Sequence, residues 1–108
     1  MEEMAIDIYE DRNGNRPFPN WLYALRDVKT QARIESRIRR LGLGHMGDYR
    51  LLSSGLLELR LDFGPGYRVY CSRIDNRILL LLCGGDKSTQ SRDIRTARQY
   101  LADYKERA

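Results

Sequence analysis

Cysteine and histidine, the usual ligands of structural zinc, are scarce in this sequence. The 108 residues include two cysteines, Cys71 and Cys83, and one histidine, His45. No CxxC pair and no Cys/His cluster occurs, which argues against a metal site. We therefore expect no metal and no cofactor. Both cysteines are interpreted as reduced thiols of the core, and His45 as a loop residue.

Long apolar runs are also missing. The longest, residues 78–83, is much shorter than the roughly 20 residues that a membrane-spanning helix needs. The sequence opens without an apolar stretch behind a basic flank, so we expect no signal peptide, no membrane partner and a cytoplasmic location. The balance of 42% hydrophobic and 31% charged residues is typical of a folded globular protein. We expect a single domain over residues 1–108.

Positive charge is in moderate excess and is unevenly distributed. Nineteen lysines and arginines oppose fifteen aspartates and glutamates, for a formal net charge of +4. The basic residues concentrate in residues 26–50, where Arg33, Arg37 and Arg40 recur at helical spacing. A localised basic surface attracts phosphate backbones, so these three arginines are candidate RNA contacts. A solvated or partner-facing helix face explains them equally well.

Apolar periodicity predicts the order β-α-α-β-β-β-α, a small α+β fold in which helices pack on an antiparallel or mixed sheet. Glycines and an aspartate at positions 84–86, followed by Lys87, are expected to leave the sheet after its central strand. Strands are predicted at residues 5–9, 56–63, 67–74 and 78–83, with an irregular start near 50–52. Helices are predicted at residues 20–26 and 30–41, and after a cap at 88 or 91.

Two predicted strands flank Gly64, Pro65 and Gly66, which is a hairpin signal. A three-residue turn that pairs Phe63 with Tyr67 gathers the apolar side chains on one face of the sheet and the polar ones on the other. The polar face, with Lys87 leaving the adjacent strand toward it, is expected to present Glu58, Arg60, Arg68 and Tyr70.

Two interpretations of this polar face remain open from the residues alone. Guanidinium groups bind phosphate oxygens in a bidentate fork and stabilise charge that grows during phosphoryl transfer, and a tyrosine can stack on a base. The alternative is cross-strand ion pairing, of Asp62 with Arg68 and of Glu58 with either Arg60 or Arg68.

Three stretches of the chain resemble a known protein family. They are FPNWL at residues 18–22 ahead of the basic segment, ELR at 58–60 with GYRVY at 66–70, and LCGGDKSTQ at 82–90. Together they resemble the phage-related addiction module killer branch of the RelE/ParE toxins, close to the HigB-like toxins. The similarity covers nearly the whole chain and implies a RelE-like fold.

The resemblance implies a cytoplasmic toxin of a bacterial type II toxin–antitoxin module. Its partner would be a cognate antitoxin, often with a helix-turn-helix domain, through which alone it would meet operator DNA. RelE-like members cut mRNA on the ribosome without a metal, whereas ParE-like members inhibit DNA gyrase. We expect a ribosome-dependent endoribonuclease, an mRNA interferase that inhibits translation. A gyrase inhibitor, or an RNA- or protein-binding module without catalysis, is the alternative.

The resemblance also implies roles for individual residues. Arg68 matches the basic residue that serves RelE-type cleavage, with Arg60 beside it, and both would stabilise the phosphorane. Attack of an RNA 2′-hydroxyl on its own phosphorus also needs an acid and a base. Our candidates are Lys87 as the acid or as a phosphate clamp, and Glu58 as the base if no ion pair holds it. The chain departs from the family at Glu58, where RelE-type enzymes place a lysine, and near Asp93, where they often carry tyrosine or histidine. The predicted catalytic set is Arg68, Arg60, Lys87 and Glu58, and the predicted RNA contacts are Tyr70, Arg33, Arg37 and Arg40.

Overall fold

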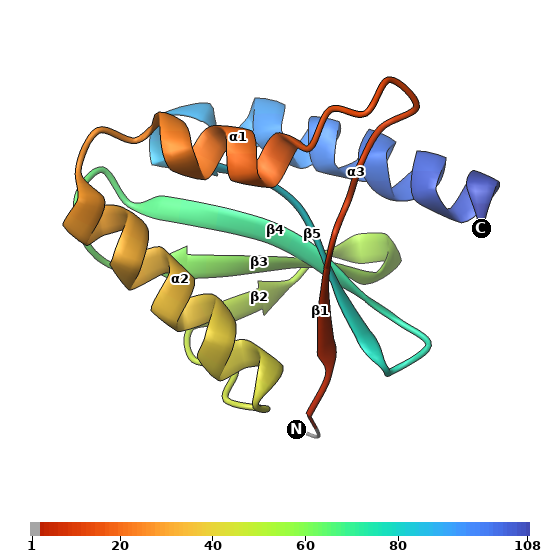
Figure 1. The fold of residues 1–108 in the computed structure, drawn as a ribbon, viewed down its shortest axis with the longest axis horizontal. Coiled ribbons are helices and arrows are strands. Elements are labelled where there is room, and N and C mark those ends of the chain that lie inside the picture. The colour runs from red at the N-terminus through yellow and green to blue at the C-terminus, as the bar shows by residue number, and fades with distance from the viewer. Residues whose placement is uncertain (1–2) are drawn as a thin grey trace.

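The computed structural model describes residues 3–108, which form an α+β fold with helices on both faces of one mixed sheet (Figure 1). The strands are β1 (Ala5–Ile8), β2 (Tyr49–Leu51), β3 (Leu56–Leu61), β4 (Tyr67–Ile74) and β5 (Ile78–Asp86). The helices are α1 (Pro17–Ala24), α2 (Val28–Gly42) and α3 (Gln90–Arg107), with short 3-10 turns at Ser53–Gly55 and Lys87–Thr89.

The strand order in the sheet is β1-β5-β4-β3-β2. β1 runs parallel to β5, and the remaining neighbours are antiparallel. β5 therefore has a strand on each side and a helical layer on each face, which explains why its sequence is almost continuously apolar. β1 and β2 are the two edges of the sheet.

Each face of the sheet has its own apolar cluster. α1 and α2 cover one face, where Phe18, Leu22, Ile34, Leu59 and Leu81 are among the buried members. α3 covers the other face, where Leu56, Leu80, Leu82, Ala97 and Leu101 are buried. Cys71 and Cys83 are free and buried, one in each cluster, which confirms their interpretation as core thiols, and burial raises the pKa of each to about 12.

The first two helices begin earlier than periodicity predicts, for local reasons. Pro17 occupies the first turn of α1, where its missing amide proton costs nothing. Asp27 caps α2: its carboxylate accepts a hydrogen bond from the Lys29 amide at 3.1 Å. None of the helices in residues 3–108 has the length and apolar character needed to cross a bilayer.

The glycine-rich segment that was expected to leave the sheet instead extends β5. Gly84 and Gly85 pair with Val69 and Arg68 of β4. A side chain at Gly84 would collide with the Trp21 ring, and one at Gly85 would collide with the Asp93 carboxylate. Glycine is weak in strands, but here it lets two large groups rest directly on the backbone, one from each helical layer.

The hairpin register differs from the prediction by two residues. Tyr67 lies opposite Leu61 rather than Phe63, so the connection spans five residues. Gly64 and Gly66 both adopt positive φ, 56° and 80°, and the Gly66 amide bonds to the Phe63 carbonyl. A shift of two keeps every side chain on its predicted face but changes its neighbour. Asp62 is not opposite Arg68.

The prediction that the polar face of the hairpin is open to solvent is wrong for Glu58 and Tyr70. Glu58 and Tyr70 have no exposed surface, because they lie beneath α3. The same face carries Leu56, Leu80 and Leu82, and burial of this apolar half under α3 draws the polar half in beneath the start of the helix. Alternation along a strand assigns side chains to a face, but does not tell whether a helix covers that face.

Candidate functional site

The polar end of the α3 face holds the strongest candidate site. Arg60 of β3 lies directly opposite Arg68 of β4, and both side chains belong to this face. Two like charges at directly opposed positions repel each other unless anions offset them. The structure therefore brings together the two arginines that sequence analysis singled out, and their partners decide what the pair can bind.

The two arginines differ sharply in their partners. Arg60 is part-exposed and ion-paired with Asp48, whose Oδ1 lies 2.9 Å from Nη2. Arg68 is only 7% exposed and forms no ion pair with any residue in the described part of the chain. Its Nη1 donates to the Gly66 and Tyr67 carbonyls at 3.1 Å, and its Nε has no partner. A buried guanidinium that no carboxylate neutralises is a strong attractor for an anion.

Lys87 lies beside this arginine. It follows β5 directly, and Asp86 fixes the turn by accepting from the Ser88 amide at 2.8 Å. The aliphatic stem of Lys87 runs over Gly66, with its Cγ 3.0 Å from where a β-carbon would stand. Because the Gly66 carbonyl accepts from Arg68, the two cationic side chains flank one residue. Lys87 is exposed and forms no ion pair within residues 3–108.

Glu58 is engaged rather than free. Its Oε2 accepts from the Tyr70 hydroxyl at 3.0 Å and from the Gln90 amide at 2.7 Å. Its Oε1 lies 3.3 Å from Arg50 Nη2, close enough for an ion pair but not aligned as a hydrogen bond. The carboxylate therefore ties β2, β4 and the start of α3 to β3, and its predicted role as a base would break this network.

Tyr70 is likewise held in place, by burial and by its hydrogen bond to Glu58. Its ring is fully buried, so it cannot stack on an RNA base as predicted without leaving the core. Burial, and then the negative charge of Glu58, raise the pKa of its hydroxyl above the usual range. The neutral hydroxyl is thus a permanent donor to Glu58.

Sequence reasoning missed three partners in this site, Asp48, Arg50 and Gln90, and it noted Asp93 only as a departure from the family pattern. The first two lie at the sheet edge, and nothing in the hairpin pattern indicates them. Asp93 is 7% exposed, rests on Gly85 and accepts a short hydrogen bond from the Thr89 hydroxyl. An acid in the first turn of a helix is one available signal for Asp93.

The three arginines of α2 do not form one surface stripe. Arg37 is buried and donates to the carbonyls of Arg60, Met46 and Asp48 at 2.7, 2.9 and 2.6 Å. Burial lowers the pKa of its guanidinium. Arg33 is exposed and covers the Phe63 ring at 3.7 Å, and Arg40 is exposed.

These α2 residues surround a separate small hollow on the other helical layer. It has a volume of about 150 Å³ and is lined by Arg33, Arg37, Arg40, Leu61, Asp62 and Phe63. Arg37 hydrogen-bonds to the backbone carbonyl of Arg60 in the candidate site, while the side chains of Arg33 and Arg40 are exposed to solvent. His45 is exposed between α2 and β2, as a loop residue.

Comparison with known proteins shows the family of this chain. An uncharacterized protein from Haemophilus influenzae is 46% identical over 81 residues, which are 75% of this chain and 82% of that protein. The chain belongs to the same family as this relative. No family model matches it.

Proposed function

We propose that this protein is the toxin of a bacterial type II toxin–antitoxin module, with a RelE-like fold, and that it cleaves mRNA on the ribosome. One observation carries the proposal: Arg68 is buried at the end of a strand pair, faces Arg60 in register, and has no carboxylate partner within the described residues. A phosphate diester is an anion that such a guanidinium would bind.

The three cations take different parts in this proposal. Arg68 stabilises the charge that grows on the phosphorane, because it is preorganised by two backbone carbonyls. Lys87, exposed beside Gly66, clamps the phosphate or donates a proton to the leaving 5′-oxygen. Arg60 adds positive potential while Asp48 holds its orientation.

Glu58 and Tyr70 are assigned positioning rather than chemical roles in this proposal. Both are fully buried and bonded to each other, so neither meets the RNA. The 2′-hydroxyl would then be deprotonated by a group outside this network, and ribosomal RNA and the A-site environment would supply the positioning.

A second candidate function is phosphate binding without cleavage. It is favoured by the engagement of three carboxylates near the two arginines. Asp48 pairs with Arg60, Glu58 pairs with Arg50, and Asp93 accepts from Thr89. A module of this kind would bind RNA at Arg68 and block its target by occupancy alone.

The deciding experiment expresses wild-type protein, Arg68→Ala and Lys87→Ala in bacteria and maps mRNA ends. Wild type should create new 5′ ends within codons, and loss of Arg68 should slow their appearance roughly 100- to 1,000-fold, the usual effect of removing one oxyanion donor. Arg68→Lys keeps a charge without the fork and guards against misfolding. The matched control is Arg73→Ala, an exposed arginine near the other end of β4.

Three outcomes separate the candidates. Cleavage that persists undiminished in folded Arg68→Ala and Lys87→Ala would refute the site. Ribosome binding that depends on Arg68, with intact mRNA, would establish the non-cleaving module. Intact mRNA together with loss of plasmid supercoiling would place the protein among the gyrase inhibitors.

A further inference from the structure

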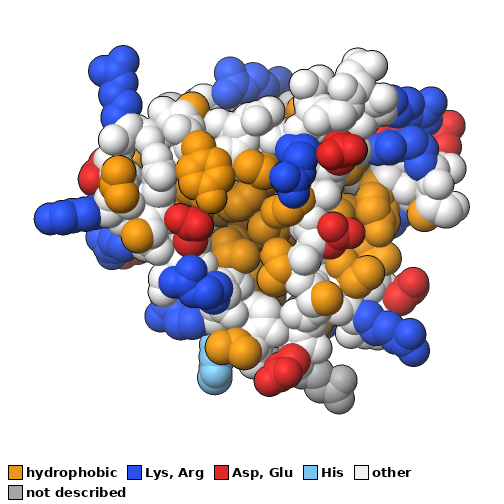
Figure 2. All heavy atoms as spheres, in the orientation of Figure 1, with side chains coloured by type: hydrophobic (Ala, Val, Ile, Leu, Met, Phe, Trp, Pro, Cys, Tyr) orange, Lys and Arg blue, Asp and Glu red, His pale blue; other side chains and the backbone are white. Residues whose placement is uncertain are grey.

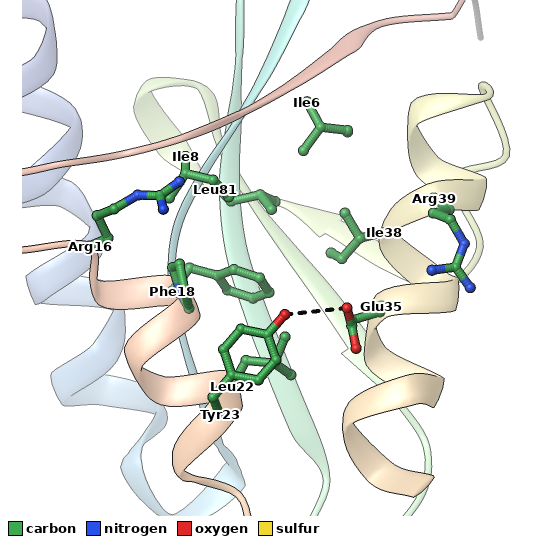
Figure 3. A pocket seen from close by; sticks show the side chains of 11 residues that line it. Ile6, Ile8, Arg16, Phe18, Leu22, Tyr23, Glu35, Ile38, Arg39 and Leu81 are labelled. Carbon is green, nitrogen blue, oxygen red and sulfur yellow. Dashed lines mark hydrogen bonds between the residues drawn. The ribbon is translucent and has the colours of Figure 1, made fainter. Parts of the chain in front are cut away.

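An apolar groove lies on the face of the sheet that α1 and α2 cover, opposite the face to which the arginine pair belongs. It has a volume of about 400 Å³ and opens between α1, α2 and the edge strand β1 (Figure 3). Its apolar walls come from Ile6, Ile8, Phe18, Leu22, Ile38 and Leu81. Figure 2 shows it as a hollow of hydrophobic side chains in the middle of the view, rimmed by charged ones.

In the groove, side chains of the apolar core are not fully covered by other residues of the chain. Leu81 of the central strand is buried, yet it contributes to the groove floor. Tyr23 is 59% exposed and Ile6 is 38% exposed beside it, so apolar surface continues beyond the hollow. A volume of this size lies within the range of roughly 300–1,000 Å³ that binding pockets span. Continuous exposed apolar surface with a polar rim is characteristic of a docking site.

The charges on the rim define the chemistry of the occupant. Arg16 stands at the α1 side and Arg39 at the α2 side, with the apolar floor between them (Figure 3). Neither guanidinium forms an ion pair or donates a hydrogen bond to any residue that the structure describes. The rim also carries one acid, Glu35, whose Oε2 accepts from the Tyr23 hydroxyl at 3.4 Å, so two arginines share the rim with a single carboxylate. An apolar segment flanked by carboxylates therefore complements this surface on both sides.

The backbone at the groove favours a helix over an added strand. β1 is an edge strand, but the amide of Ile8 donates to the Asp7 carboxylate at 2.8 Å instead of facing outward unpaired. Charged, self-satisfied edges resist strand addition. The walls are themselves two helices, and a third helix would fill the space between them with side chains at i, i+3, i+4 and i+7.

We propose that this groove is the docking surface for an acidic amphipathic helix of a partner protein, whose apolar stripe fills the hollow while its carboxylates meet Arg16 and Arg39. A second copy of this chain is a poorer occupant. A two-fold contact would bring Arg16 and Arg39 of both copies into one interface, where only the two Glu35 carboxylates of the rims would offset four guanidinium groups.

The test is a selection from a display library of random peptides of about 15 residues, long enough for four helical turns. The immobilised bait is the full chain. Enriched peptides should combine an apolar i, i+3, i+4, i+7 pattern with an excess of Asp and Glu. Amide chemical-shift changes on adding an enriched peptide should cluster at Ile6, Ile8, Tyr23 and Ile38.

Matched charge reversals complete the test. Arg16→Glu with Arg39→Glu should weaken the enriched peptides at least about tenfold, an effect of about 1.4 kcal/mol or more. Arg73→Glu with Arg77→Glu makes the same change of net charge at exposed positions of β4 and its following turn, and should leave affinity within about twofold. The proposal fails if no acidic peptide is enriched, if the shifts map elsewhere, or if both reversals act equally. Concentration-dependent dimerisation through the same residues would instead identify a second copy as the occupant.

Discussion

Removal of the Tyr70 hydroxyl tests whether the centre of the polar cluster is structural or chemical. In Tyr70→Phe the ring stays in place, and Glu58 Oε2 loses one of its two donors while Gln90 keeps the other. A hydrogen bond to a charged group contributes about 1.5–3 kcal/mol, and neither Tyr70 nor Glu58 has surface exposed to solvent. Because one donor remains, we expect a loss of about 2 kcal/mol in the free energy of unfolding.

The assay is urea unfolding at pH 7, followed by circular dichroism. A loss of this size lowers the unfolding midpoint by roughly 1–2 M urea without changing the slope. Tyr100→Phe is the matched control, since Tyr100 stacks on Tyr9 at 4.8 Å but its hydroxyl has no hydrogen-bond partner among residues 3–108. It should change stability by less than about 0.5 kcal/mol.

The same variant separates two roles for Tyr70. If it is a positioning residue, folded Tyr70→Phe retains mRNA cleavage at temperatures below its lowered unfolding transition. The reasoning is refuted if Tyr70→Phe is as stable as Tyr100→Phe, or if it is well folded and yet loses cleavage completely.

Three further outcomes are expected from the geometry. Arg37→Met removes the guanidinium donor of three carbonyls, of which the Asp48 carbonyl keeps the Arg60 amide at 2.9 Å, and should cost roughly 3 kcal/mol in urea unfolding. The exposed Arg40→Met should stay within about 0.5 kcal/mol. Gly85→Ala forces a methyl into the carboxylate that rests on this residue and should destabilise by roughly 1–3 kcal/mol, measured the same way. The thiol pKa values of Cys71 and Cys83, raised to about 12 from 9, contribute stability that is present below pH 9 and lost as pH rises. Between pH 9 and 10 the free energy of unfolding should therefore fall by about 1 kcal/mol per thiol, and Cys71→Val should remove one of the two contributions.

Much of the fold was accessible from the sequence because burial imposes periodicity. The apolar run of β5 correctly indicated a central strand, and alternation in β3 and β4 placed Arg60 and Arg68 on one face. Both results depend only on the two-residue period of a strand, which survives an error of two residues in the hairpin register. The pairing of Arg60 directly across from Arg68 changes with the register, so only the structure reveals it.

Other features of the site depend on long-range packing that no local pattern records. The cover that α3 places over Glu58 joins residues 32 positions apart through Gln90. The burial of Arg37 depends on carbonyls of the loop before β2 and of β3, which helical spacing within α2 cannot report. Gly84 and Gly85 looked like a strand terminator because their need for close packing is visible only from Trp21 and Asp93.

The glycine pair in β5 has a mechanical consequence. At this point the tryptophan of the groove-side layer and the aspartate of the opposite layer are separated by the thickness of a single peptide chain. Because glycine has no side chain that could change its rotamer, an occupant of the groove that displaced α1 would also displace the β5 backbone and the group packed on its other face. This displacement would reach the first turn of α3 and Lys87, which precedes that helix.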